Sequence, residues 1–419
     1  MRTFFRAALD EARSLLRDPA PLVVLVGSVI VYSLLYPAPY MNKVLKRVPV
    51  AVVDLDHSAT SRRLTRLIDA HELTAVARVL DDEREAAELE RAGVVSGTVV
   101  IPPRFERDLL RGDRAAIGEF ADASNLLTYR QLSTGVGAAA KVVSTTIKVR
   151  RLVASGTPRG EATARRAPLA FDMQPLHNPV EGYDSFIVPA VFALILQQTL
   201  LIGIGIRGGG AREDAARARG DVRAEAARTD GAREDAARAA VGDAVGSGAN
   251  APARGGGAAP RSLVRSAAVV LGRAAVYCAL YLVHVVFYFG VVCPLHGFGG
   301  APDSAARLLV FTAPFIVSAT FLGLACGAFW PRRETALQAL MFTSIPAAFL
   351  AGFAWPAQAI PLWLRAPAAL IPSTTGIAGL VRVLRMGASL ADVAWEWGIL
   401  WALAALYFSL AVAAETRRG

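Results

Sequence analysis

The distribution of apolar segments along the chain limits its fold more than any other feature. One apolar segment, Ala20–Tyr36, lies near the N-terminus, and the next begins only near Phe186. A transmembrane helix needs about 20 apolar residues, with ~17 as the lower end. The sequence therefore predicts one membrane crossing, a large domain outside the membrane, and then a bundle of further crossings. This layout is typical of a transporter or a sensor rather than a soluble enzyme.

The composition agrees with a polytopic membrane protein, because apolar residues make up 54% of the 419 residues. The net charge is +10, from 45 Lys and Arg against 35 Asp and Glu. Much of this excess lies beside the apolar segments, as the positive-inside rule requires, so we expect no nucleic-acid partner. Cys278, Cys293 and Cys326 lie in or at the end of apolar segments. Their spacing fits neither a disulfide framework nor a metal site, and we expect no metal.

Six apolar segments are predicted to span the membrane. Arginines beside these segments place both termini in the cytoplasm and the region between the first two spans on the other side. We therefore predict an α-helical polytopic membrane protein with six transmembrane helices and an inserted extracytoplasmic α/β domain. The predicted spans are 20–36, 184–206 (apolar from Phe186), 263–292, 308–330, 335–352 and 395–414.

The inserted domain, predicted over residues 37–183, shows an alternation of strand and helix patterns. Such alternation favours an α/β fold with a partly parallel sheet. The predicted strands cover residues 48–55, 73–80, 94–101 and 115–121, and the predicted helices cover residues 58–70, 82–91, 102–110 and 125–154.

Two groups of titratable residues have both a functional and a structural interpretation. Asp54, Asp56 and His57 follow the first predicted strand, where α/β domains often bind ligands. Ser58 and Thr60 come next, and this sequence is equally typical of a turn and a helix N-cap, which we favour. His284 lies within an apolar span, so it is a functional candidate by default, although a neutral hydrogen-bonded histidine is the more common case.

Residues 207–262 differ from the rest of the chain because they consist largely of Ala, Gly, Arg, Asp and Glu. The sequence Gly-Ala-Arg-Glu-Asp-Ala-Ala-Arg-Ala occurs twice, at 210–218 and 231–239. With few large apolar side chains, the segment cannot offset its ordering entropy, so we predict a disordered or transiently helical cytoplasmic insert. Its two Gly-Gly-Gly runs, at 208–210 and 255–257, read as flexible linker.

The first 19 residues are predicted to form a cytoplasmic amphipathic helix. Apolar residues recur there at helical spacing, and the pattern ends at Asp18-Pro19. Such a helix should lie in the membrane interface with its arginines toward anionic headgroups, so we expect contact with membrane lipids.

A proline-rich segment, 353–374, separates the fifth and sixth predicted spans. Broken backbone at membrane depth marks a pathway or a moving element, and the segment is predicted to be re-entrant. The alternative is a proline-kinked helix followed by an interfacial turn. The candidate gate or pathway residues are Ser344, Pro346, Gly352, Phe353, Pro356, Pro361, Pro372 and Thr374.

Three stretches of the chain resemble the permease subunits of bacterial ABC-2-type transporters with a large domain between the first two spans. The first is Ala8-Leu-Asp-Glu-Ala-Arg-Ser-Leu-Leu-Arg-Asp-Pro19, similar to the family's N-terminal elbow helix. The second is Val50-Ala-Val-Val-Asp-Leu-Asp-His-Ser58, similar to the strand that opens the outer domain. The third and most specific is Leu350-Ala-Gly-Phe-Ala-Trp-Pro356 with Ile360-Pro361 and Leu370-Ile-Pro-Ser-Thr374, similar to the family's fifth span and re-entrant segment.

The resemblance implies an exporter permease of the bacterial inner membrane that is not itself an enzyme. It would move a hydrophobic or amphipathic substrate, drug-like or lipid-like, out of the cytoplasm or inner leaflet. A second permease chain, as homodimer or heterodimer, a separate ABC ATPase and a periplasmic adaptor are its implied partners. ATP and Mg would bind the ATPase, since this chain has no Gly-x-x-x-x-Gly-Lys-Ser/Thr loop, and we expect no cofactor and no catalytic residue here.

In that family the elbow helix and the loop between spans 2 and 3 contact the ATPase. The low-complexity insert departs from the family pattern within this loop. The alternative function is a membrane-anchored extracytoplasmic ligand-binding or sensor protein without transport activity. The candidate ATPase-coupling residues that the resemblance implies are Phe4, Phe5, Glu11, Arg13, Arg17, Arg207 and Arg265.

Overall fold

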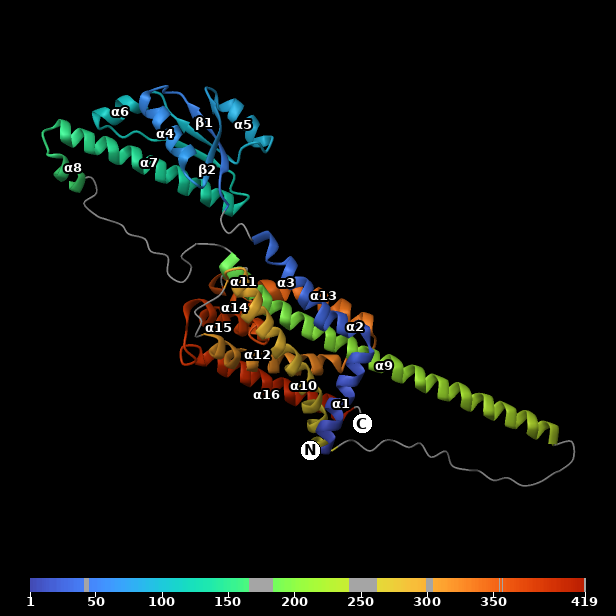
Figure 1. Ribbon diagram of the computed structural model, residues 1–419. Helices are drawn as coiled ribbons and strands as arrows, with labels where there is room; N and C mark the ends of the chain where they lie inside the picture. Colours follow the sequence, from blue (N-terminus) through green and yellow to red (C-terminus); the bar gives the residue numbers. More distant parts are fainter. Residues whose placement is uncertain are drawn as a thin grey trace. The chain divides into compact units, whose positions relative to one another are not determined.

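The structure is a computed structural model that describes residues 1–40, 45–165, 184–240, 262–298, 304–353, 355 and 357–417. The chain divides into two compact units (Figure 1). Met1–Met41 and Glu181–Gly419 form the first, which we call the membrane unit, and Asn42–Val180 form the second, the inserted domain. The region between the first two apolar segments therefore folds as a domain of its own, as predicted.

The inserted domain contains a four-stranded sheet with strand order β2-β1-β3-β4. Strand β1 is parallel to β2 and β3, whereas β4 is antiparallel to β3, so the predicted partly parallel sheet is confirmed. The strands are β1 (Val48–Asp54), β2 (Thr74–Leu80), β3 (Gly97–Ile101) and β4 (Gly118–Ala121).

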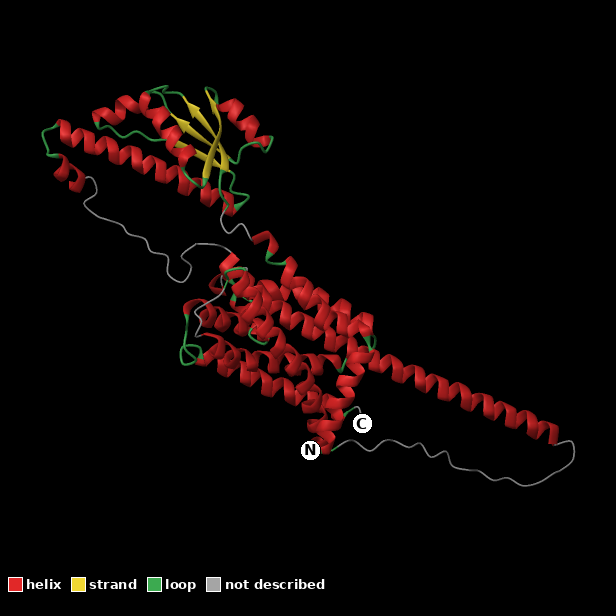
Figure 2. Cartoon of the chain, viewed as in Figure 1, coloured by secondary structure: helices red, strands yellow, loops and turns green. Residues whose placement is uncertain are grey.

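Helices cover both faces of this sheet (Figure 2). Because side chains alternate along a strand, Val50 and Val52 pack under α4, α6 and α7, and Ala51 and Val53 pack under α5. The domain thus has two small apolar cores, one on each side of the sheet. Its helices are α4 (Ala59–Ala70), α5 (Glu83–Arg91), α6 (Phe105–Arg111), α7 (Leu126–Ala154) and α8 (Arg159–Arg165).

The described part of the membrane unit is helical. Four of its helices are long and apolar enough to cross a membrane, or up to six elements if each of two bent helix pairs counts as one span. The first segments are α1 (Arg2–Arg17), α2 (Pro19–Leu22), the π-helical η1 (Val23–Gly27), α3 (Ser28–Leu35) and η2 (Ala38–Tyr40). The later segments are α9 (Asp184–Ala240), α10 (Leu263–Val285), the π-helical η3 (Val286–Val292), α11 (Cys293–Leu295), α12 (Ser304–Gly327), α13 (Arg333–Leu350), η4 (Ala357–Ala359), α14 (Leu362–Ala368), α15 (Pro372–Met386) and α16 (Ala394–Thr416).

The predicted fifth span, Thr335–Gly352, lies almost entirely in α13, which is not among these four to six candidates. Its first turn carries Arg333 and Glu334, and Pro346 lies inside it. These residues lower its apolar character below that of the four helices that could cross a membrane. The broken shape predicted for the proline-rich segment appears in α14 and α15, which meet at 89°.

A sharp corner separates the N-terminal helix from the first apolar segment. Helix α1 and the segment Pro19–Leu35 are inclined at 87° to each other. Asp18 makes this corner, because its side chain accepts a hydrogen bond from the backbone N–H of Ala20 and Pro19 occupies the first helical position. The predicted helix end at Asp18-Pro19 is therefore confirmed.

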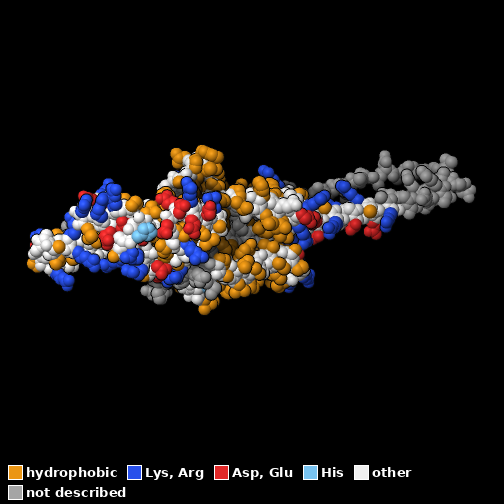
Figure 3. All heavy atoms as spheres, turned by 90° about the horizontal axis from the view of Figure 1, so that it is seen from above, with side chains coloured by type: hydrophobic (Ala, Val, Ile, Leu, Met, Phe, Trp, Pro, Cys, Tyr) orange, Lys and Arg blue, Asp and Glu red, His pale blue; other side chains and the backbone are white. Residues whose placement is uncertain are grey.

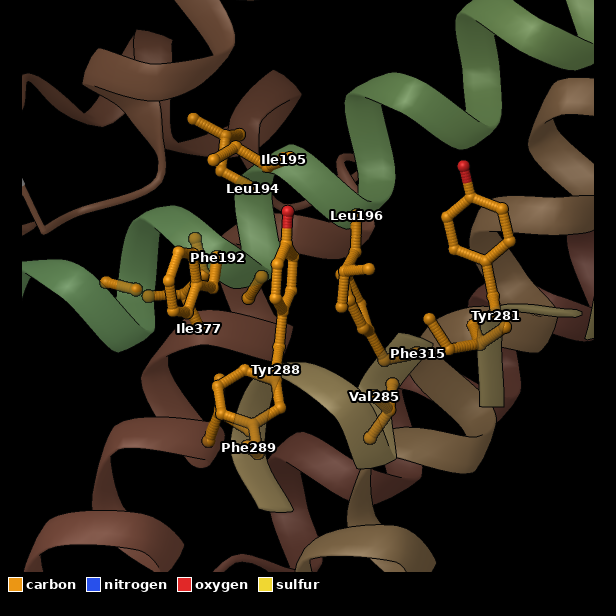
Figure 4. Packing of buried hydrophobic residues seen from close by; sticks show 14 of the residues in the cluster. Phe192, Leu194, Ile195, Leu196, Tyr281, Val285, Tyr288, Phe289, Phe315 and Ile377 are labelled. Atoms are coloured by element: carbon orange, nitrogen blue, oxygen red, sulfur yellow. The ribbon is translucent and has the colours of Figure 1, made fainter. Parts of the chain in front are cut away.

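The apolar core of the membrane unit is rich in aromatic side chains from α9, α10 and α12 (Figure 4). Phe192 and Tyr288 stack with their ring centroids 4.3 Å apart. Tyr288 also donates a hydrogen bond to the backbone oxygen of Val29 in the first apolar segment. On the outside of the unit, apolar side chains cover much of the face shown in Figure 3.

Helix α9 differs from the prediction for residues 207–262. It continues through Arg207 to Ala240, where the sequence predicted a disordered or transiently helical segment. Ala, Arg and Glu favour helix, and Glu213 stands four residues before Arg217, a spacing that stabilises helices. The side chains from Arg217 to Ala226 are exposed, so this part of the helix gains nothing from packing. Residues 241–261 lie outside the described part of the chain.

The glycine run at 208–210 is not a flexible linker, and that prediction was wrong. Gly208, Gly209 and Gly210 lie in α9 where it passes close to the end of α12 and the start of α13. A Cβ added at Gly208 would lie 2.5 Å from the carbonyl oxygen of Gly327, and one added at Gly209 would lie 2.5 Å from that of Arg332. Only glycine permits this backbone approach.

Candidate functional site

One group of buried charges ties the N-terminal helix to the helices of the membrane unit. Glu11 of α1 is only 7% exposed, although the other charged residues of this helix are exposed. A buried carboxylate needs charged or hydrogen-bonding partners, and Glu11 finds them on two other helices. We call this group the Glu11 cluster; its members are Glu11, Arg207, Arg273, Tyr277 and Glu415.

The contacts of the Glu11 cluster link four helices. The Tyr277 hydroxyl of α10 donates a hydrogen bond of 2.7 Å to Glu11 Oε1. Arg207 Nε of α9 lies 3.7 Å from Glu11 Oε1, and Arg273 Nε of α10 lies 3.5 Å from Glu11 Oε2. Arg273 also donates a 3.1 Å hydrogen bond to Glu415 at the end of α16. Two carboxylates thus face two guanidinium groups, so the charges of the cluster balance.

The two arginine–Glu11 contacts are ion pairs rather than hydrogen bonds, because 3.5 Å and 3.7 Å exceed the usual N–H···O range. Arg207 Nε is buried and has no hydrogen-bond partner among the described residues. A cavity of about 80 Å³ lies between these groups and is lined by both glutamates, both arginines and Tyr277 together with small residues of α9, α12 and α16. The cluster therefore surrounds space into which its side chains can shift.

A second charge group joins the α1–α2 corner to α9 and α13. Arg333, the first residue of α13, contacts both carboxylate oxygens of Asp18 at 3.0 and 2.8 Å. It also pairs with Glu213 at 3.7 Å and Asp214 at 3.9 Å, within the first copy of the repeated motif. We call Arg333, Asp18, Glu213 and Asp214 the Arg333 cluster. It fixes the point where α9 leaves the packed bundle.

An open groove runs beside the Arg333 cluster, with a volume of about 590 Å³. Side chains of both signs line it, including the exposed Arg13 and Arg17 of α1. It lies along the same helix that carries Glu11. A protein docked there would contact α1, α9 and α13 at once.

The structure brings together some of the predicted coupling residues and separates others. Glu11 and Arg207 pair directly, and Arg13 and Arg17 share the groove with Arg207. The rings of Phe4 and Phe5 contact each other edge to face, with Phe5 exposed. Arg265 is exposed at the start of α10 and belongs to neither charge cluster.

The predicted gate residues do not form a single cluster. Ser344 and Pro346 lie on α13, Gly352 and Phe353 lie in the turn after it, and Pro361 precedes α14. Gly352 has a φ of +81°, so this turn needs glycine.

Pro372 and Thr374 open α15, and the Thr374 hydroxyl is buried without a partner among the described residues. Pro356 lies outside the described residues.

The loop after α15 is held by a local contact. The hydroxyl and the backbone N–H of Ser389 donate hydrogen bonds to the Asp392 carboxylate and lower its pKa.

Two groups had both a functional and a structural interpretation: the residues after the first strand, and His284. Asp54 accepts hydrogen bonds from the backbone N–H groups of Asp56 and His57 and from the Ser61 hydroxyl, which is the favoured turn interpretation. The described residues hold no group of His, Cys, Asp and Glu suited to a metal ion. His284 is buried, and its Nδ1 has no partner in the described part of the chain.

Sequence reasoning missed Arg273, Tyr277, Glu415 and Arg333 as site residues. Arg273 and Glu415 are charges within or at the end of apolar helices, which is the signal that could have identified them. Tyr277 gave no signal, because tyrosines are common in membrane helices. Its role is visible only once α1 lies against α10.

Comparison with known proteins decides the family. A family model described as ABC-2 family transporter protein matches residues 22–218 and 261–413. The chain belongs to the ABC-2 transporter family. The match includes Arg207, Arg273 and Arg333 and stops short of residues 219–260, so the outer part of the α9 extension is an insertion relative to the family model.

Two curated relatives agree with this family. Both are named inner membrane transport permease YhhJ, one from Escherichia coli (strain K12) and one from Shigella flexneri. Each is 33% identical to this chain over 139 residues. The alignment covers 33% of this chain and 35% of each relative, so the chain spans about a third of the length of the relatives it matches. Together with its apolar helices, family membership makes this ABC-2 protein a multi-pass membrane protein.

Proposed function

We propose that this ABC-2 protein is the permease subunit of an ATP-driven exporter in a bacterial inner membrane. It moves a hydrophobic or amphipathic substrate, drug-like or lipid-like, outward with a separate ABC ATPase. The family match and the name of the relatives, inner membrane transport permease, support this proposal. The arginine distribution supports an orientation with both termini in the cytoplasm and the inserted domain outside.

The observation that carries the proposal is the Glu11 cluster. An ATPase can drive transport only if its movement reaches the membrane helices. Through Glu11, helix α1 is tied to α9 and α10, and through Arg273 to α16. A partner that displaces α1 therefore displaces three long helices together. The groove beside Arg13 and Arg17 offers the ATPase a docking surface along that helix.

Two further partners belong to the proposal. A second permease chain would cover part of α13, where Phe342 and Ile345 are exposed and apolar. A periplasmic adaptor would bind the inserted domain. Membrane lipids cover the remaining apolar surface.

The first test is purification of the tagged full chain from its native membranes in mild detergent. We expect an ATPase carrying a Gly-x-x-x-x-Gly-Lys-Ser/Thr loop to co-purify, and inverted membrane vesicles to accumulate ethidium only when ATP is supplied. Reversing the groove charges with Arg13→Glu and Arg17→Glu should remove the ATPase. Arg2→Glu and Arg6→Glu, at exposed arginines of the same helix outside the groove, provide the matched control.

Two results would contradict the proposal. One is a chain that purifies without an ATPase while its vesicles show no ATP-dependent accumulation of ethidium or of a fluorescent lysophospholipid. The other is equal loss of the ATPase in both charge-reversed variants, which would show that the groove is not its docking surface.

A further inference from the structure

A fully buried glutamine lies in the apolar part of α9. Gln197 is 0% exposed, and it lies in one of the helices that are long and apolar enough to cross a membrane. Its Oε1 accepts a 2.7 Å hydrogen bond from the backbone N–H of Ser373, and its Nε2 donates a 3.1 Å hydrogen bond to the Ser373 hydroxyl. Both ends of the amide therefore bind a single residue of another helix.

Helices α14 and α15 together form what we call the proline-rich hairpin, and Ser373 lies at the start of its second helix. Ser373 follows Pro372, the first residue of α15, so it belongs to the helix start, where backbone N–H groups have no partner within the helix. In a membrane interior no water replaces a lost partner. Gln197 supplies the bond that α15 cannot make for itself. The start of α15 is thus fixed to α9 by a directional polar contact.

Helix α15 also contacts α12 and α16. At its C-terminal end, Arg307 of α12 donates a hydrogen bond to the backbone oxygen of Gly387, and Arg382 pairs with Glu396 of α16. Gly376 and Gly379 lie against the rings of Phe315 and Phe311 on α12. Apolar contacts of this type are not directional, so they hold the helices together without fixing one position along the axis. The bidentate contact of Gln197 with Ser373 does fix that position. The start of α15 is therefore fixed to α9 by a directional contact of its own. The directional contacts with α12 and α16 lie elsewhere, at the C-terminal end of α15 and at Leu370 in the turn before it, which accepts a hydrogen bond from Tyr407.

Helix α9 carries several polar attachments along one continuous helix, including the hydrogen bond that the Thr199 hydroxyl accepts from Tyr281 of α10. Gln197 holds the hairpin, Arg207 pairs with Glu11, and Glu213 and Asp214 pair with Arg333. Gln197 and Arg207 are ten residues apart in the sequence, which corresponds to about 15 Å of helix. A displacement applied at the Glu11 cluster therefore acts on the same rigid segment that holds α15.

We propose that Gln197 is a positioning residue that makes the proline-rich hairpin follow α9. Movement of α1 by a nucleotide-driven partner then reaches the hairpin through Arg207, the body of α9 and the Gln197–Ser373 bonds. This inference rests on the proposed function, because it needs an ATPase that moves α1. Beyond the proposed function, it identifies Gln197 as the residue that transmits the movement of α9 to the hairpin.

The experiment measures two distances in the co-purified complex by pulsed electron paramagnetic resonance, with the three native cysteines replaced by alanine. Spin labels at Trp363→Cys and Trp395→Cys report the hairpin, and labels at Leu9→Cys and Phe329→Cys report the N-terminal helix. All four positions are exposed. Each pair is measured without nucleotide and after trapping with ATP and vanadate.

In the parent complex we expect both distances to change on trapping. Gln197→Ala should reduce the change at the hairpin pair by at least half and leave the change at the N-terminal pair intact. Gln198→Ala is the matched control, because the neighbouring glutamine lies on the same helix and its Oε1 has no partner among the described residues. Ser373→Ala, which retains the bond from the Ser373 backbone N–H, should give an intermediate result and serves if Gln197→Ala does not fold.

The outcomes separate the two ideas. If neither pair changes in the parent complex, or no ATPase co-purifies, the proposed function fails. If both pairs change in the parent and Gln197→Ala or Ser373→Ala retains the full change at the hairpin, the proposed function stands and the role of Gln197 is refuted. An equal loss in Gln198→Ala would also refute it, because that variant leaves both Gln197 bonds in place.

Discussion

A single methyl group at Gly208 should destabilise the membrane unit, although alanine favours helix more than glycine does. The added Cβ would lie 2.5 Å from the carbonyl oxygen of Gly327, a backbone atom that cannot rotate away. Overpacking of this kind costs about 1–3 kcal/mol, and the better helix propensity of alanine returns about 1 kcal/mol. Because the obstacle is backbone, we expect a net loss of about 1–2 kcal/mol, or about 2–8 °C in the midpoint of thermal unfolding.

Gly220→Ala is the matched control on the same helix. A Cβ added there meets nothing within 4 Å, so this variant should not lower the midpoint. The assay heats purified protein and measures the fraction that remains monodisperse on size-exclusion chromatography. Equal midpoints for Gly208→Ala and Gly220→Ala would refute the reasoning, since a flexible glycine run would accept either change.

Three further results are expected. Glu11→Gln keeps an acceptor for Tyr277 but loses the negative charge that faces Arg207. A double-mutant cycle with Arg207→Gln, measured by thermal or detergent unfolding, should give a coupling free energy of about 0.5–2 kcal/mol. A coupling near zero would show that the two residues are not energetically linked. Arg333→Lys keeps the charge but not the separate guanidinium nitrogens that contact Asp18, Glu213 and Asp214, so its midpoint should lie between those of the parent and Arg333→Ala. Replacing residues 221–260 by a Gly/Ser linker should leave the midpoint of thermal unfolding unchanged, because the described side chains from Asp221 to Ala226 are exposed. A clear fall in the midpoint would show that this segment packs against the rest of the protein.

The inserted domain could be predicted well because its elements follow from local patterns. Strand β1 is a short valine-rich segment ending in Asp54, and Ser58 then caps α4 by accepting a hydrogen bond from the backbone N–H of Ser61. Each of these features is visible in a few consecutive residues. The helix end at Asp18-Pro19 was readable for the same reason, since a proline marks a helix boundary wherever it occurs.

The candidate site could be predicted only in part, because its contacts join residues far apart in the sequence. Glu11 and Arg207 were identified from the resemblance, but their pairing depends on how α1 crosses α9 and α10. The glycines at 208–210 misled the interpretation. Composition alone cannot distinguish a glycine that makes the backbone flexible from one that permits close packing. Here the glycines permit close packing, because the backbones of Gly327 and Arg332 leave no room for a Cβ.

Those glycines also bear on how α9 could transmit force. Each glycine within a helix weakens it by about 1 kcal/mol relative to alanine, so a segment containing Gly203, Gly205 and Gly208 should bend easily in isolation. In the structure these positions lie against Leu25, Leu340 and the backbone at Gly327, which leave no room for a Cβ. Bending α9 there would open voids along those contacts, and lost packing in a dense interior is costly. The stiffness of the connection between Arg207 and Gln197 therefore comes from the neighbouring helices rather than from α9 itself, and a change that loosens their packing should weaken coupling without touching either charge cluster.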